Sequence, residues 1–139
     1  MKLKKNTLFF LSLLFACHFL CAQNYDSIYN KISENLLRFE STIVIKKVDS
    51  ILGEEKIPDI VKNDLKSLRV EALAQLSFFT PALKLANEIL SNKNNVSEKA
   101  EIRISIQKAL IFEFFGKPKE TILELNRLEE IYKNREKDR

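Results

Sequence analysis

Apolar side chains recur at steps of three and four residues along nearly all of the chain after residue 24. This is the periodicity of amphipathic helices, not that of strands. In the third such stretch Val61, Leu65, Leu68, Ala72 and Leu76 fall on one helix face. The pattern predicts six helices, over about residues 24–38, 41–52, 58–78, 81–92, 97–115 and 118–134. The predicted fold class is therefore all-α.

The residues that start and stop helices agree with these boundaries. Pro58, Pro81 and Pro118 stand at the starts of predicted helices, where a missing backbone N–H has no cost. Ser97 is the predicted N-cap of the fifth helix, and Gly53 the predicted C′ residue of the second. Since no Gly, Ser or Pro-rich linker interrupts the pattern, residues 23–139 are expected to form one domain.

The fifth predicted helix is apolar on nearly all sides, with Leu110 and Ile111 on different faces and Phe112, Phe114 and Phe115 following. Such a helix is expected to be buried by neighbours on both faces. If the sixth helix covers only one side, part of this surface requires a partner or a second copy of the chain to cover it.

The six predicted helices form three hairpins that resemble one another. Residues 44–52 align with residues 82–90 at an offset of 38, and residues 82–90 align with residues 121–129 at an offset of 39. A repeat of this length is typical of a helical solenoid, in which each unit buries its apolar face only against its neighbours.

Here the chain resembles the tetratricopeptide repeat (TPR) family, over most of residues 40–132. That motif has small and aromatic positions in its first helix, a turn, and small and larger positions in its second helix. In the third hairpin these places are taken by Ala109, Phe112, Gly116, Thr121 and Leu125. In the second hairpin they are taken by Val70, Leu73, Ala82 and Ala86. The chain departs from the family in its lack of tryptophan, in Lys108 at a leucine position, and in a period longer than about 34 residues. The resemblance implies an α–α superhelix, a TPR-like solenoid of about three helical hairpins.

Residues 1–22 are predicted to be a secretory signal peptide. Lys2, Lys4 and Lys5 precede an apolar run over residues 7–20, and the expected cleavage point follows Ala22. The run is short of the roughly 20 residues that span a bilayer. The processed chain is therefore expected to have no membrane span and to be exported, to the periplasm or outside the cell. An uncleaved N-terminal anchor is one alternative.

A lipid anchor is a second alternative at the N-terminus. The segment from Leu14 to Cys17 looks like a lipobox, a signal that ends in a cysteine to be acylated. Acylation of Cys17 would make the protein membrane-anchored.

Removal of residues 1–22 would also remove both cysteines, the only histidine and the only methionine. The processed chain could then form no disulfide, no thiolate or imidazole metal site, and no nucleophile that needs a histidine base. Of the 23 basic residues 20 would remain against 19 acidic ones, which gives no field to attract nucleic acid. The sequence therefore predicts no enzyme, no cofactor, no metal site and no nucleic-acid partner.

The TPR resemblance implies that extended peptides bind the concave surface, which the first helix of each hairpin forms. On that basis the candidate binding residues are the polar side chains Lys66, Arg69, Arg103 and Gln107. Arginine and lysine there could hold a peptide carboxylate. The alternative is that these are ordinary surface charges.

The leading hypothesis is an exported, non-enzymatic TPR-like module that binds a protein or peptide. It could be the sensory or scaffold part of an envelope signalling system, and a second copy of the chain is a further candidate partner. The alternative is a small helical bundle that binds an apolar ligand between its helices, using its phenylalanines. A hydrolase built only from carboxylates is a third hypothesis.

Overall fold

The computed structural model describes residues 25–54 and 56–137, and these contain helices, turns and loops but no strand. The chain divides into two units, Met1–Lys31 and Ile32–Arg139. In the first unit residues 25–31 are helical. The predicted signal peptide, its cleavage point and the alternative anchor at Cys17 lie outside the described residues.

Six helical stretches match the six that the sequence predicts, so the all-α class is confirmed for the described residues. The first runs through residues 25–37. The others are α2 (Ser41–Leu52), α3 (Asp59–Gln75), α4 (Phe79–Ser91), α5 (Glu98–Phe114) and α6 (Pro118–Lys137). A single 3₁₀ turn, η1 (Lys93–Asn95), precedes α5.

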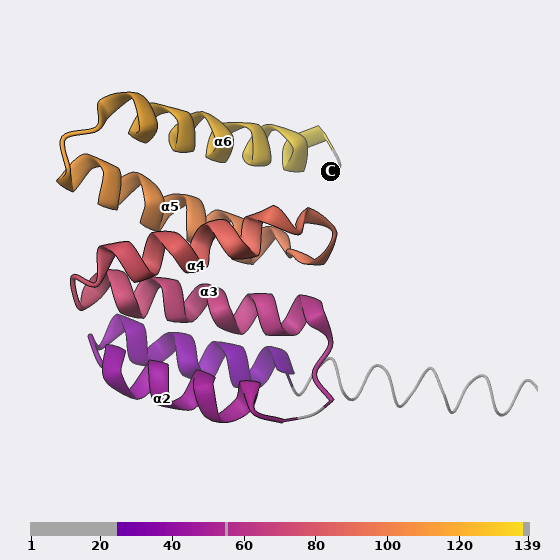
Figure 1. Ribbon diagram of the computed structural model, residues 1–139. Helices are drawn as coiled ribbons and strands as arrows, with labels where there is room; N and C mark the ends of the chain where they lie inside the picture. The colour runs from indigo at the N-terminus through magenta and orange to yellow at the C-terminus, as the bar shows by residue number, and fades with distance from the viewer. Residues whose placement is uncertain (1–24, 55, 138–139) are drawn as a thin grey trace, which may run out of the picture. The chain divides into compact units, whose positions relative to one another are not determined.

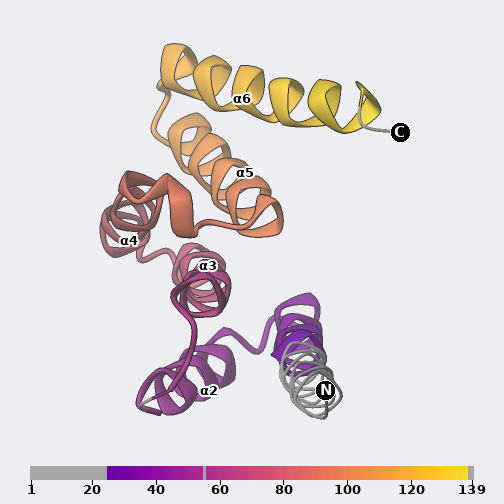
Figure 2. The ribbon, with the colours of Figure 1, turned by 90° about the vertical axis from the view of Figure 1, so that its right-hand side faces the viewer.

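Within the second unit the helices are stacked in chain order (Figure 1). α2 packs on α3, α3 packs on α4 and α5, α4 packs on α5, and α5 packs on α6. The turns within hairpins lie on one side of the stack, and the connections between hairpins lie on the other (Figure 1). Figure 2 shows α3 and α4 nearly end-on but α6 along its length, so the helix direction changes from hairpin to hairpin.

The main core lies between α3, α4 and α5. Its buried members are the aliphatic and alanine side chains Val70, Ala82, Ala86, Ile89, Ile104 and Ile111. Alanines on α4 allow α5 to approach closely, and isoleucines on α5 fill the space between the helices. A second buried set, on α2 and the α3 face that meets it, includes Val44, Val48, Leu65 and Leu68.

The same turn joins the two helices of each hairpin. Its residue with a positive φ is Phe39 (58°), Ser77 (62°) or Gly116 (65°), at successive offsets of 38 and 39 residues. In each turn the following backbone N–H donates to the carbonyl five residues earlier: Glu40 to Asn35, Phe78 to Leu73, and Lys117 to Phe112. This is the hydrogen bond of a Schellman motif, which satisfies a carbonyl at the end of the first helix. The 38- and 39-residue offsets of the sequence alignment thus recur in the backbone geometry.

Several predicted boundaries were wrong by a few residues. The third helix ends at Gln75 and not at 78, because Leu76 to Phe78 form the turn. α4 begins at Phe79, so Pro81 lies inside the first turn, where an α-helix still needs no donor. α6 extends to Lys137 instead of 134. Gly53 does follow α2 directly, but its φ is −74°, so this helix end does not use glycine's left-handed freedom.

The N-cap prediction for Ser97 is confirmed, since its side-chain oxygen accepts a hydrogen bond from the Ala100 N–H. The expectation that α5 is buried on both faces holds only in part. Ile104, Ala109 and Ile111 are buried, but Leu110 and Phe114 are exposed. The reason is that α3, α4 and α6 surround only part of the circumference of α5.

Candidate functional site

Two of the predicted binding residues, Lys66 and Arg69 of α3, form ion pairs with neighbouring helices. The Lys66 Nζ lies 3.1 Å from Oε1 of Glu88 on α4. The Arg69 Nε lies 3.4 Å from Oδ1 of Asp49 on α2. The two side chains therefore join α3 to different neighbours and do not converge on one position.

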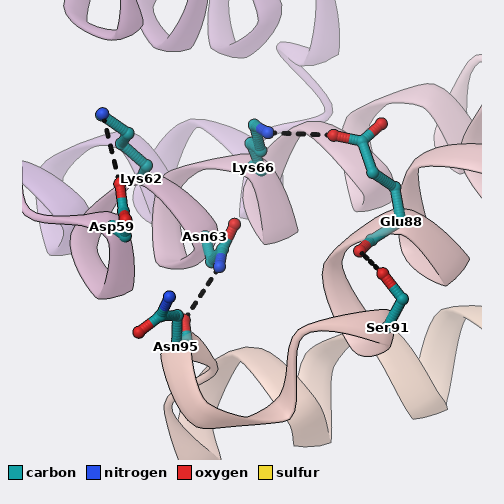
Figure 3. A network of polar contacts seen from close by, with 7 residues as sticks. All are labelled: Asp59, Lys62, Asn63, Lys66, Glu88, Ser91 and Asn95. Atoms are coloured by element: carbon teal, nitrogen blue, oxygen red, sulfur yellow. Dashed lines mark hydrogen bonds and ion pairs between the residues drawn. The ribbon is translucent and has the colours of Figure 1, made fainter.

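Lys66 belongs to a row of polar contacts along α3 (Figure 3). Earlier in the helix, the Asn63 side-chain amide donates to the Asn95 carbonyl of η1 at 2.9 Å. Beyond Lys66, the Ser91 hydroxyl donates to the Glu88 carbonyl at 2.7 Å. The ion pair from Lys66 and the hydrogen bond from Asn63 hold α4 and η1 against α3, whereas the Ser91 hydrogen bond lies within α4. The contacts around Lys66 are therefore structural.

The third candidate, Arg103 of α5, lies between three helices. Its guanidinium forms an ion pair with Glu71 of α3. It also donates from Nη2 to the Ser33 hydroxyl at 3.1 Å, which reaches the helix before α2. A peptide carboxylate would compete with Glu71 for the Arg103 guanidinium.

The fourth candidate, Gln107, is half-buried one turn after Arg103 on the same helix. The structure thus brings Arg103 and Gln107 together on α5 and leaves Lys66 and Arg69 in other contacts. The four residues therefore do not contact one another in a common site.

The departure from the TPR pattern at Lys108 has a counterpart in α6. The Lys108 Nζ lies 2.5 Å from Oε1 of Glu124, and both side chains are almost wholly buried. The ammonium also lies 5.9 Å from the centre of the Phe112 ring. Glu124 occupies the position that Leu85 occupies one hairpin earlier. Lys108 corresponds in the same way to Arg69, so the third hairpin differs from the second in carrying a carboxylate opposite a basic side chain that both hairpins have.

Two carboxylates, Glu124 and Asp64, are buried among the described residues. Asp64 of α3 is buried, where it pairs with the Lys99 Nζ at 3.1 Å and accepts a hydrogen bond from the Ser97 hydroxyl. Both carboxylates are compensated by a lysine on the adjacent first helix. The sequence carries a signal for the pair: Glu124 stands where the second hairpin has Leu85, and Lys108 stands where the TPR pattern has leucine.

The phenylalanines at the α3–α4 and α5–α6 turns pack largely on one another. The ring of Phe79, in the first turn of α4, lies 4.8 Å from that of Phe114 and 5.6 Å from that of Phe115. Phe114 and Phe115 are themselves exposed on the outer side. This cluster is part of the packing between α4 and α5.

A side of α6 that α5 leaves uncovered carries an apolar stripe. Its exposed members are Pro118, Ile122, Leu125 and Tyr132, at helical spacings of three, four and seven residues. At its beginning lies an open groove, lined in part by Glu113, Lys117 and Thr121 in addition to Pro118, Ile122 and Leu125. We call the four exposed residues Pro118, Ile122, Leu125 and Tyr132 the α6 stripe.

No group of three or more histidine, cysteine, aspartate or glutamate residues suited to a metal ion occurs among the described residues. Across residues 25–54 and 56–137, no helix has both the length and the apolar character needed to cross a membrane.

Comparison of the chain with protein-family models, with curated protein sequences and with solved structures finds no match. The geometry of the chain itself therefore carries the functional argument.

Proposed function

We propose that this chain is a non-enzymatic, TPR-like helical-repeat module that binds a protein or peptide. The observation that carries the proposal is the α6 stripe, in which Leu125 is 51% exposed and Ile122 is 56% exposed. Large apolar side chains in a row on one helix face are typical of a surface that another protein covers.

The polar candidates give weaker support to peptide binding on the first helices. Lys66, Arg69 and Arg103 each have an acidic partner within the chain. A peptide carboxylate would replace one ion pair with another, so little free energy would be gained. We therefore place the principal binding surface on α6, and the pair Arg103 and Gln107 second.

Site-specific photo-crosslinking in the native cells tests this function. A benzophenone amino acid replaces Leu125, and matched samples carry it at Gln107 and at the exposed Lys84 of α4. The proposal predicts one discrete protein adduct at position 125 and none at position 84. If neither position 125 nor position 107 gave a protein adduct, while the chain was present at its normal level, the proposal would be wrong.

Export is a further part of the proposal, and it rests on the pattern of residues 1–22. The intact mass of the protein from its native cells tests it. A chain that begins at Gln23 is the expected result. A chain that retains Met1, or that carries lipid on Cys17, would contradict cleavage after Ala22, and the second of these would show a membrane-anchored protein.

A further inference from the structure

The α6 stripe occupies a position that is covered in both preceding hairpins. The shared turn sets the equivalence, so Val48 of α2, Ala86 of α4 and Leu125 of α6 correspond, at offsets of 38 and 39. Val48 and Ala86 are both 0% exposed, whereas Leu125 is half exposed. Phe79 and Pro118 also correspond, and here too the residue of the second hairpin is half-buried whereas that of the third is exposed.

In the first two hairpins the covering element is the first helix of the next hairpin. α3 packs on α2, and α5 packs on α4. Each covering helix runs antiparallel to the helix beneath it, since consecutive helices reverse direction (Figure 1).

In both hairpins the last turn of the covering helix lies beside the first residues of the helix that it covers. The Ser41 hydroxyl, at the start of α2, donates to the Gln75 side chain at the end of α3. At the equivalent places one hairpin later, Phe79 packs on Phe114 at the end of α5. In the third hairpin the equivalent place is Pro118, and there the groove is open. The groove is thus the position at which a side chain in the last turn of a covering helix is expected.

Both ends of the α6 stripe carry charges of both signs, so the register of the covering helices and not charge sets the direction of the expected helix. Lys117 and Glu113 both line the groove, where the C-terminus of an antiparallel helix would be. At the other end, where its N-terminus would be, Glu129 forms an ion pair with Lys133 at 2.6 Å and Glu130 is exposed. Glu129 stands at the stripe position that Leu52 and Leu90 take in the earlier hairpins, so the charge replaces an apolar residue.

We propose that the α6 stripe binds an amphipathic helix of a partner protein, antiparallel to α6, with a large apolar side chain of its last turn in the groove beside Pro118. This inference rests on the proposed function and specifies the partner. On the pattern of α5, the partner helix carries aliphatic residues seven apart and a large apolar residue three positions later, as Ile104, Ile111 and Phe114 do.

A synthetic peptide with the sequence of residues 97–117 serves as the probe, because it contains that pattern. Its affinity is measured by fluorescence anisotropy for the full chain as cells process it, and for the Leu125→Asp and Lys84→Asp variants. The expected result is binding that Leu125→Asp weakens at least about tenfold and that Lys84→Asp leaves unchanged. A Phe114→Ala peptide should also bind more weakly, because it leaves the groove empty.

A spin label at one end of the peptide tests the direction. At the C-terminus it should broaden the NMR signals of Lys117 and Lys119, and at the N-terminus those of Glu129 and Glu130. The reverse pattern would overturn the antiparallel arrangement.

Three other results would overturn the inference. The first is that the helical peptide does not bind. The second is that it binds with an affinity that Leu125→Asp leaves unchanged. The third is that the chain forms a dimer that Leu125→Asp dissociates. If the crosslink at position 125 still formed a protein adduct, the proposed function would survive and only the helical partner would be excluded.

Discussion

α4 and α6 occupy equivalent places in successive hairpins and follow the same turn, yet only α4 is covered on its far side. Ala86 of α4 is wholly buried in the core that α3, α4 and α5 share, and Leu125 of α6 is half exposed. The difference lies in the neighbour and not in the apolar character of the helix, because position 125 is the more apolar of the two. An apolar stripe in a repeat therefore shows where a neighbour fits, and only the structure shows whether one is present.

The two helices also differ on the side that faces the first helix of the same hairpin, which is α3 for α4 and α5 for α6. α4 has Leu85 there, half-buried, whereas α6 has the buried Glu124 paired with Lys108. The third hairpin thus joins its two helices in part by a charged contact.

The largest expected effect separates the covered helix from the uncovered one. Ala86→Asp places an unpaired carboxylate in the core and should lower the free energy of unfolding by about 4 kcal/mol or more. Leu125→Asp should change it by only about 0.5 kcal/mol, because the side chain there reaches solvent. Urea unfolding of both variants gives the comparison. Equal losses would mean that the α6 stripe is buried within the chain, against the structure.

Next in size is the ion pair between α5 and α6. Lys108→Ala leaves Glu124 buried without its partner and should cost about 3–5 kcal/mol. The double change Lys108→Leu with Glu124→Leu restores apolar residues at both positions, and it should be neutral or stabilising. Thermal unfolding of the single and double variants tests this. A double variant no more stable than the single one would mean that the charges contribute more than their burial costs.

Two substitutions in the shared turn should change the free energy of unfolding by smaller amounts and in opposite directions. Ser77→Gly should stabilise by about 0.5–1 kcal/mol, because glycine adopts a positive φ without the strain of a side chain. Gly116→Ala should destabilise by about 1 kcal/mol for the same reason. A Cβ at Gly116 would meet no atom within 4 Å, so no steric clash confuses the result. Effects of the same sign in the two variants, by urea unfolding, would contradict the equivalence of the turns.

The smallest effect is expected at the end of α6. The Arg135 guanidinium lies 2.7 Å from Glu98, but both side chains are about half exposed. Water and salt weaken such a pair, so Arg135→Ala should cost no more than about 0.5 kcal/mol. A cost above about 1 kcal/mol, in low salt and in 0.5 M salt alike, would show that α6 is held to α5 by its last turn.

Most of the fold could be predicted from the sequence, since helix periodicity and the prolines located all the helices. The errors fell at the turns. Phe39 and Ser77 adopt a positive φ without being glycine, so no local signal marks these turns, and the predicted third helix runs through its turn. Gly53 supplied the expected signal but has an ordinary φ. Tertiary packing decided these positions.

The candidate site was less predictable. A helical pattern places Lys66 and Arg69 on a helix but does not identify their partners, Glu88 and Asp49, which lie on two other helices. The sequence predicted an uncovered apolar surface in the last hairpin but did not locate it on α6. Its location required knowledge of which side of α6 faces α5.

The most direct test of the central claim, that the α6 stripe receives a helix, uses single cysteines. In a Cys17→Ser, Cys21→Ser background, Leu125→Cys and Ala86→Cys each introduce the only thiol, and its rate of reaction with a maleimide is measured with and without the peptide of residues 97–117. The account predicts fast reaction at position 125, strong slowing there by saturating peptide, and slow reaction at position 86 in both conditions. A reaction at position 125 that is already slow, or that the peptide leaves unchanged, would contradict it.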